Sequence, residues 1–282
     1  MSEDARYCLK ISCKNKPGIV AAVSGCIAAN DGDILEAAQF DDTETGQFLM
    51  RIYFSTPSIE RIEFELKPIV ERFAMRIEVI PESQVGRALI MVSRMDHCLH
   101  DLLYRWRNGS LSMDVVGIVS NHRDTEELAE RYDVPFHYLP VTKDNKSEQE
   151  EKLLEIVAKE RVDLVILARY MQILSDQVAN KLYGKVINIH HSFLPSFKGA
   201  KPYHQAHARG VKLTGATAHY VTPDLDEGPI IEQEVTRVKH SDTIEDLVRL
   251  GQDTEARVLA RAVHWHLEHR VLLNGSKTVV FT

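Results

Sequence analysis

The chain has 282 residues, of which 44% are hydrophobic and 27% charged, and its formal net charge is −7 at pH 7. This length predicts two domains with separate cores, and the negative charge argues against a nucleic-acid partner. There is no apolar run of 18 residues, so no membrane span is expected. The acidic start, Met1-Ser2-Glu3-Asp4, differs from a secretory signal, and the four cysteines form no C-x-x-C pair. Reduced thiols and a cytoplasmic location are therefore expected.

The first 80 residues predict a small domain of alternating strands and helices. Residues 7–14 alternate apolar and polar side chains, as a half-buried strand does, and the turn Asn15-Lys16-Pro17-Gly18 follows. The periodicity then predicts a helix, two strands, a second helix and a last strand, over 19–30, 33–40, 47–56, 58–73 and 75–80. The resulting order β-α-β-β-α-β is the ferredoxin-like arrangement.

Two motifs of this first domain resemble an ACT domain. They are Lys16-Pro17-Gly18-Ile19-Val20 after the first strand and Gly32-Asp33-Ile34-Leu35-Glu36 at the second. The resemblance implies pairing between subunits, and therefore a homo-oligomer, either a dimer or a tetramer. It also implies a small effector, often an amino acid, at the first β-α turn, which holds Asn15, Pro17, Gly18 and Ile19. A purely structural dimerisation module is an equal alternative, because a fold does not fix a function.

The short polar stretch from Pro81 to Gly86 is the expected domain boundary. We therefore assign residues 1–82 to the ferredoxin-like ACT domain and 83–282 to a second domain. Strands are expected over 87–93, 113–120, 135–139, 163–168, 185–189, 214–221, 230–238 and 277–281, and helices over 96–107, 124–132, 146–160, 175–182 and 243–272. This alternation predicts a Rossmann-like α/β domain with a mostly parallel sheet covered on both faces.

Asn188 and His190 lie at the C-terminal end of a buried strand of the second domain. Residues two apart in a strand share a face, so the amide and the imidazole project together, where open α/β sheets bind ligands. An amide N–H can donate to a developing oxyanion, and an imidazole can move a proton near neutral pH. The alternative is that both residues only close off the strand.

Three carboxylates, those of Asp224, Asp226 and Glu227, lie in the loop 222–229 between two late strands. Such a cluster is typical of a solvated turn, but a carboxylate near His190 would keep the imidazole charged and could order a water molecule. His219 lies just upstream and is a second candidate, although a hydrogen-bonded core histidine is a more common role.

Four segments together resemble the folate-dependent formyltransferase family over about 87–275: Asn188-Ile189-His190, Leu194-Pro195-x-Phe197-x-Gly199, Thr214-Gly215-x-Thr217-x-His219 and Asp226-x-Gly228-Pro229-Ile230-Ile231. The resemblance implies that Asn188, His190 and Asp226 are catalytic and that 10-formyltetrahydrofolate is the formyl donor, without a tightly bound cofactor. It also implies a folate-binding site formed by Met171, Gln172, Ile173, Leu174, Gly199 and His219. Ordinary core packing is the alternative for Met171, Ile173 and Leu174.

The turn after the first strand of this domain, Ser93-Arg94-Met95-Asp96, bears on the formyl acceptor. In the glycinamide ribonucleotide transformylases of the family this turn is rich in glycine and binds a phosphate at a helix N-terminus. Here it has no glycine, and Ser93-x-x-Asp96 predicts a capping box that satisfies the helix N-terminus internally. No role beyond capping and packing is expected for Asp96, His97 and Cys98.

The segment 96–106 resembles the hydrolytic members of the family, for which water is the formyl acceptor. The lack of a glycine-rich phosphate-binding turn is a second point of resemblance to them. This resemblance implies hydrolysis of 10-formyltetrahydrofolate to tetrahydrofolate and formate. Transfer to an amine acceptor of the glycinamide ribonucleotide type and a non-catalytic sensor of folate or amino acids are the alternatives. No metal is expected, because adjacent strand residues such as His190 and His191 point to opposite faces and cannot easily share one ion.

Overall fold

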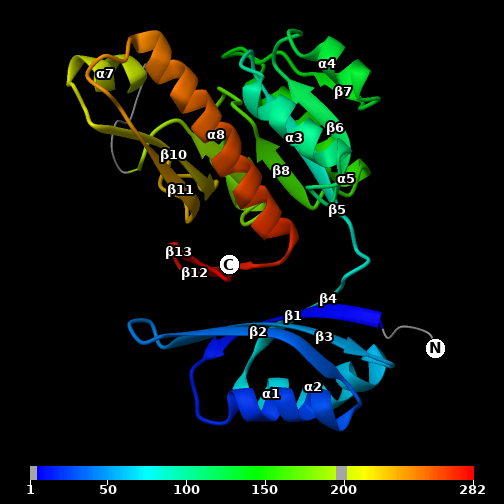
Figure 1. Cartoon of the computed structure of the whole chain (residues 1–282). Helices are drawn as coiled ribbons and strands as arrows, with labels where there is room; N and C mark the ends of the chain where they lie inside the picture. The colour runs from blue at the N-terminus through cyan, green and yellow to red at the C-terminus, as the bar shows by residue number, and fades with distance from the viewer. Residues whose placement is uncertain (1–4, 195–201) are drawn as a thin grey trace. The chain divides into compact units, whose positions relative to one another are not determined.

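The computed structural model describes residues 5–194 and 202–282, which divide into two compact units, each built on its own sheet (Figure 1). The first unit runs to Val85 and also contains the C-terminal segments Glu268–Asn274 and Thr278–Thr282. The second unit comprises Gly86–Leu267 and Gly275–Lys277.

The N-terminal unit has the expected element order: β1 (Ala5–Lys14), α1 (Ile19–Ala29), β2 (Asp33–Asp42), β3 (Gln47–Thr56), α2 (Ile59–Phe73) and β4 (Arg76–Pro81). Its sheet is antiparallel with the strand order β2-β3-β1-β4, and both helices lie on one face of it (Figure 1). Ile27 of α1 and Ile62 of α2 pack against Leu9 and Ile52 of the sheet in one apolar core. The assignment of this unit as an ACT domain stays a prediction.

The C-terminal end of the chain differs from the expected division. A helix to residue 272 was predicted, but the last helix ends at Leu267, and His269 has a left-handed backbone with φ 57°. The hairpin of β12 (Val271–Asn274) and β13 (Lys277–Val280) follows. Leu272 and Phe281 pack against Leu49 of the N-terminal unit.

Hydrogen bonds between segments far apart in sequence hold this hairpin in the N-terminal unit. Arg270 Nη1 donates to Glu36 Oε1 at 2.9 Å, and Asn274 Nδ2 donates to Asp42 Oδ2 at 2.7 Å. The segment was assigned to the second domain because one boundary, at Pro81–Gly86, was expected to divide the chain.

The second unit contains β5 (Gly86–Val92), α3 (His97–Arg107), β6 (Met113–Ser120), α4 (Glu126–Arg131), β7 (Phe136–Tyr138), α5 (Lys146–Lys159), β8 (Leu164–Leu167), α6 (Asp176–Lys181), β9 (Val186–His190), α7 (Pro202–Ala208), β10 (Leu213–Tyr220), β11 (Ile230–Arg237) and α8 (Ile244–Leu267). The strand order is β11-β10-β9-β8-β5-β6-β7. The five strands from β9 to β7 run parallel, whereas β10 and β11 are antiparallel. The expected mostly parallel α/β sheet is therefore confirmed.

The central strands explain where a site can form in this sheet. Apolar runs such as Leu89-Ile90-Met91 are buried on both faces, as parallel strands covered by helices require. The chain adds β6 on one side of β5 and β8 on the other, so the strand order reverses there, and ligands bind beyond the carboxyl ends of strands at such a point. The antiparallel register pairs His219 of β10 with Asn188 of β9, close to that edge.

Candidate active site

The three predicted catalytic residues lie together, and His219 joins them. His190 Nδ1 is 3.3 Å from Asp226 Oδ2, and His219 Nε2 is 3.7 Å from Asp226 Oδ1. Asn188 Nδ2 lies 3.2 Å from His219 Nε2. The strand end supplies the amide and one imidazole, as their two-residue spacing predicts, and the loop after β10 supplies the carboxylate. Their catalytic roles stay predictions.

The loop 222–229 folds back tightly and carries Asp226 inward. Asp226 has a left-handed backbone with φ 58°, and Tyr220 N donates to Pro229 O at 2.9 Å across the base of the loop. A Cβ on Gly228 would lie 1.7 Å from Tyr220 O, so only glycine fits there. Asp224 and Glu227 are exposed, as a solvated turn requires, but Asp224 also lines the cavity described below, as Asp226 does.

The charges of the cluster support an ionised carboxylate. Burial alone would raise the pKa of Asp226, but hydrogen bonds from His190 and His219 outweigh burial and lower it well below its usual range. His219 Nδ1 lies 2.9 Å from the carbonyl oxygen of Tyr220, which only accepts, so this nitrogen carries a proton. His190 Nε2 is buried and has no hydrogen-bond partner among the described residues, so it is available to a ligand.

A cavity of about 560 Å³ adjoins this cluster. Its lining includes Asn188, His190, His219 and Asp226, together with the whole 171–174 loop (Met171, Gln172, Ile173 and Leu174). A cavity of this size, with apolar walls and a few converging polar groups, is typical of a small-molecule site. Gly199, the remaining predicted folate contact, lies outside the described residues.

The 171–174 loop presents apolar side chains to this cavity. Met171 is 56% exposed and Ile173 is 58% exposed, so the core-packing alternative does not hold for them. Leu174 is buried and belongs to the apolar core of the unit as well as to the cavity wall. Exposed apolar side chains beside a cavity are typical of a surface that binds a ligand.

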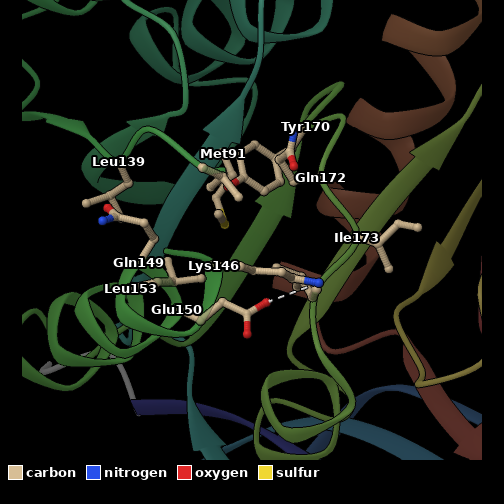
Figure 2. Close-up of a pocket in the computed structure, with 11 residues that line it drawn as sticks. Met91, Leu139, Lys146, Gln149, Glu150, Leu153, Tyr170, Gln172 and Ile173 are labelled. Atoms are coloured by element: carbon tan, nitrogen blue, oxygen red, sulfur yellow. Dashed lines mark ion pairs between the residues drawn. The ribbon is translucent and has the colours of Figure 1, made fainter. Parts of the chain in front are cut away.

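A second, much smaller pocket of about 10 Å³ adjoins this loop (Figure 2). It shares Tyr170, Gln172, Ile173 and Leu174 with the main cavity and is otherwise lined by core residues such as Met91 and Leu153. Lys146 and Glu150, 4.0 Å apart, lie at its edge. The pocket has at most the room of one water molecule, so we regard it as a packing defect and not as a ligand site.

Ser93, at the end of β5, fixes the start of the 171–174 loop. Its Oγ donates to Asn121 Oδ1 at 2.7 Å and accepts the backbone N–H of Met171 at 2.9 Å. The predicted capping box is therefore wrong: α3 begins at His97, and its N-cap residue, Asp96, makes no side-chain cap bond within the described part of the chain. The prediction failed because the Ser93 hydroxyl bonds across the sheet instead of to its own helix.

His191 also lines the cavity, although it was expected to point away from His190. The two rings lie 5.1 Å apart between centroids, because β9 ends at His190 and strand alternation stops there. Burial, followed by the charges of Arg169 and His190, lowers the pKa of His191 to about 4. His191 is therefore a neutral imidazole at neutral pH.

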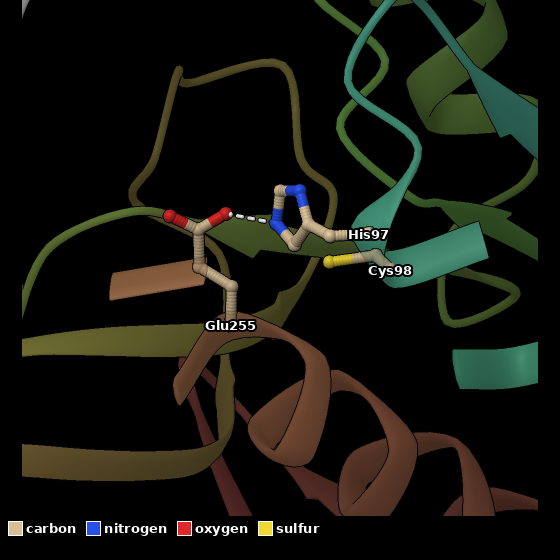
Figure 3. A group of neighbouring side chains, drawn as sticks. All are labelled: His97, Cys98 and Glu255. Atoms are coloured by element: carbon tan, nitrogen blue, oxygen red, sulfur yellow. Dashed lines mark hydrogen bonds and ion pairs between the residues drawn. The ribbon is translucent and has the colours of Figure 1, made fainter. Parts of the chain in front are cut away.

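Sequence reasoning missed a group of buried polar residues behind the cavity. Glu255 of α8 is 0% exposed, and His97 Nε2 lies 2.8 Å from its Oε2 atom (Figure 3). Arg169 is also buried, lines the cavity and lies 3.3 Å from Glu255. One signal could have revealed this group, namely a glutamate on the apolar face of a helix, one turn after Gly251.

His97, Cys98 and Glu255 are the side chains in the described residues that could hold a metal ion. Their ligand atoms lie within 4.8 Å of one another (Figure 3). Burial, however, raises the pKa of the Cys98 thiol well above its usual range, so the thiolate that would bind a metal is disfavoured. Arg169 already pairs with Glu255 at 3.3 Å, and its positive charge would repel a cation.

The predicted effector residues of the N-terminal unit line one open pocket of about 500 Å³. Asn15, Pro17, Gly18 and Ile19 form one side of it, and Asp41 and Phe48 contribute from β2 and β3. Asn15 Nδ2 donates to Asp41 Oδ2 at 2.6 Å, and Gly18 has the left-handed backbone, φ 94°, that ends the turn before α1.

Throughout 5–194 and 202–282, every helix is too short or too polar to cross a bilayer.

Comparison with known proteins identifies the family. A family model described as formyl transferase matches residues 86–263. A formyltetrahydrofolate deformylase from Corynebacterium sp. (strain P-1) is 48% identical over 99% of both chains, and one from Bacillus subtilis is 46% identical over 97% of this chain and 93% of its own. The crystal structure of formyltetrahydrofolate deformylase from Burkholderia mallei covers 99% of this chain and 100% of its own, with a TM-score of 0.95 and 50% identity. The chain therefore belongs to the formyltetrahydrofolate deformylase family.

Proposed function

We propose that the chain hydrolyses 10-formyltetrahydrofolate to tetrahydrofolate and formate, with water as the formyl acceptor. The observation that carries the proposal is that Asn188, His190 and Asp226 share one cavity with the exposed apolar side chains of Met171 and Ile173. A flat aromatic pterin ring fits such an apolar wall, and the three polar groups can act on a formyl group beside it. Relatives named formyltetrahydrofolate deformylase, similar over nearly the whole chain, support the same reaction.

In the first step, water attacks the formyl carbon, the new C–O bond forms, and the carbonyl electron pair moves to oxygen. Asn188 donates an amide N–H to this oxyanion, because it lies on the cavity wall beside the imidazoles. Asp226 orients the attacking water and accepts its proton. Its lowered pKa makes it a weak base toward free water, and the attacking water becomes acidic only as the C–O bond forms.

In the second step, the bond between the formyl carbon and N10 breaks. His190 holds its Nδ1 toward Asp226, so its buried Nε2 is the atom that faces the substrate. As an imidazolium it stabilises the oxyanion and then gives its proton to the departing N10. The C=O bond re-forms, and the formic acid that leaves ionises to formate in water. The proton held by Asp226 passes to His190, which restores the carboxylate and the imidazolium. Asp226 favours this charged imidazole, because a carboxylate 3.3 Å away stabilises the cation.

The proposal is tested by incubating the purified protein with 10-formyltetrahydrofolate in the absence of amines. Equal amounts of formate and tetrahydrofolate support it. Two outcomes would contradict it in different ways: release that requires an added amine would indicate a formyltransferase, and folate binding without turnover would indicate a sensor.

We also propose that the N-terminal unit binds a small effector, such as an amino acid, and pairs with a second copy of the chain. The pocket at Asn15 and Gly18 supports the effector, because it offers an amide and a carboxylate to a zwitterion. Calorimetric titration with the common amino acids, repeated on Asn15→Ala, tests the effector site, and analytical ultracentrifugation tests whether the chain forms a homo-oligomer.

The cytoplasmic location stays a prediction.

A further inference from the structure

Glu255 is a buried carboxylate that the proposed reaction does not use directly. Tyr203 Oη donates to its Oε1 at 2.5 Å, and His97 Nε2 and Arg169 Nε lie 2.8 Å and 3.3 Å from its Oε2. Burial would raise the pKa of Glu255, but the hydrogen bond to His97, the charge of Arg169 and the hydrogen bond to Tyr203 outweigh burial and lower it. The carboxylate therefore stays ionised inside the protein. We call these four residues the Glu255 cluster.

The Glu255 cluster gathers side chains from separate elements at one point. His97 begins α3, Tyr203 lies on α7, Glu255 lies on α8, and Arg169 follows β8. Arg169 has a left-handed backbone with φ 64°, a conformation that costs free energy in a residue other than glycine and that surrounding contacts must maintain. A Cβ on Gly251 would lie 2.0 Å from Tyr203 Oη, so α8 is shaped to admit the tyrosine. These local features indicate a specific arrangement and not incidental packing.

Two residues of the Glu255 cluster lie on the same cavity wall as the proposed catalytic residues. Arg169 and Tyr203 both line the cavity that contains His190. The ring of His191 lies 6.3 Å from that of Tyr203 and 5.1 Å from that of His190, so His191 connects the two groups. The charges of Arg169, His190, Glu255 and Asp226 all act on His191, which shows that the two ion pairs lie within electrostatic reach of the same wall.

We infer that Glu255 is a positioning residue for the proposed deformylation, which fixes Arg169 and Tyr203 on the cavity wall and balances the positive charge of Arg169. The inference rests on the proposed function, in which His190 acts as a cation. An unbalanced guanidinium on the same wall would disfavour the imidazolium, since like charges repel strongly where water is excluded. With Glu255 in place, the pair is neutral overall and His190 can carry its charge.

The charged and titratable groups around His190 come from each element that packs at this wall. They are His219 from β10, Asp224 and Asp226 from its following loop, His191 after β9, Arg169 after β8, Tyr203 and His204 from α7, Glu255 from α8, and His97 and Cys98 from α3. Removing the charge of Glu255 alone changes the sum of these charges by one unit without altering the catalytic trio.

The test is the Glu255→Gln variant, which keeps the shape of the side chain and removes its charge. We expect kcat to fall about 10²-fold, as displaced supporting groups typically cause, and KM to rise less than kcat falls, because Glu255 acts on the cavity wall only through Arg169 and Tyr203. The alkaline limb of the pH–rate profile moves to lower pH, because the unbalanced Arg169 disfavours the His190 imidazolium. A matched control is Glu234→Gln on β11, which removes a carboxylate that is paired with Arg257 and Arg261 and does not line the cavity, and which should leave kcat unchanged.

The double variant Glu255→Gln/Arg169→Met removes both charges and separates a charge effect from a simple loss of structure. The inference predicts that the alkaline limb returns to its wild-type position in the double variant. A Glu255→Gln variant with wild-type kcat and pH profile would overturn the inference. A single and a double variant with equally reduced kcat and unshifted profiles would also overturn it, because they would show a structural role alone.

An activity-independent measurement keeps this test separate from that of the proposed function. Cys98 is fully buried beside Glu255, so its alkylation, followed by mass spectrometry of the Cys98 peptide, reports whether the Glu255 cluster has loosened. We expect faster alkylation in Glu255→Gln and protection in Glu234→Gln. A wild-type protein that releases no formate contradicts the proposed function, whereas continued protection of Cys98 in Glu255→Gln contradicts the positioning role.

Discussion

Asp226 Oδ2 lies 3.3 Å from His190 Nδ1, which leaves His190 Nε2 as the buried ring nitrogen that has no hydrogen-bond partner among the described residues. This relationship gives the imidazole one fixed orientation and one available atom. The pairing therefore links the geometry of the cavity to the proton that the proposed reaction requires.

The first prediction concerns Asn188. Replacement by alanine removes the amide that we propose as the oxyanion donor, and loss of one such donor typically reduces turnover about 10²–10³-fold. We expect kcat to fall by that order while circular dichroism and the melting temperature stay close to those of the wild type. Unchanged turnover would exclude Asn188 from the mechanism.

The second prediction concerns the charge of Asp226. The pKa of this carboxyl is held well below its usual range, so it stays ionised through the neutral region and does not itself limit activity there. Asp226→Asn removes the negative charge that stabilises the His190 imidazolium. We expect kcat to fall sharply and the alkaline limb of the remaining activity to move to lower pH. A pH–rate profile of unchanged shape would contradict the tuning role.

The third prediction concerns Ser93 and the 171–174 loop. Ser93→Ala leaves the Met171 N–H without its bond and removes the bond to Asn121. Loss of a buried hydrogen-bond partner typically costs about 1–3 kcal/mol, so the free energy of unfolding should fall by that order in a urea titration. KM for the folate should rise more than kcat falls, because the loop binds and does not react. A kcat effect without a KM effect would argue against a folate-binding role for the loop.

The fourth prediction concerns the C-terminal hairpin and pH. The hydrogen bond from Asn274, followed by that from Thr45, lowers the pKa of Asp42 to about 2. A carboxyl whose pKa is lower in the folded state stabilises the fold above its unfolded pKa of about 4, and this contribution is lost as the pH falls through about 2. Asn274→Ala should therefore lower stability at neutral pH and flatten its decline between those two pH values. Urea titrations at several pH values measure both effects, and parallel curves for variant and wild type would contradict the pairing.

Local patterns predicted most of the fold and the shared position of Asn188 and His190. The two-residue spacing of Asn188 and His190 requires only a strand, and the structure has β9 there. The mostly parallel sheet follows from alternating strands and helices, and the structure confirms it. Such features could be predicted because each depends on residues close together in the sequence.

The features that were missed depend on contacts between distant segments. His97 and Glu255 are 158 residues apart, and Arg270 and Glu36 are 234 apart. Helical spacing near residue 272 could not reveal that Leu272 packs against Leu49 of the N-terminal sheet. Likewise, a capping pattern at Ser93 could not show that its hydroxyl bonds to Asn121 across the sheet.

The most direct measurement of the central claim is formate and tetrahydrofolate release from 10-formyltetrahydrofolate, without any amine, by the wild type and by Asp226→Ala. We predict equal amounts of both products from the wild type and almost none from the variant, which should still bind folate because the 171–174 loop is intact. Wild-type protein that releases formate only when an amine is added, or an Asp226→Ala variant with normal turnover, would contradict the proposed hydrolysis.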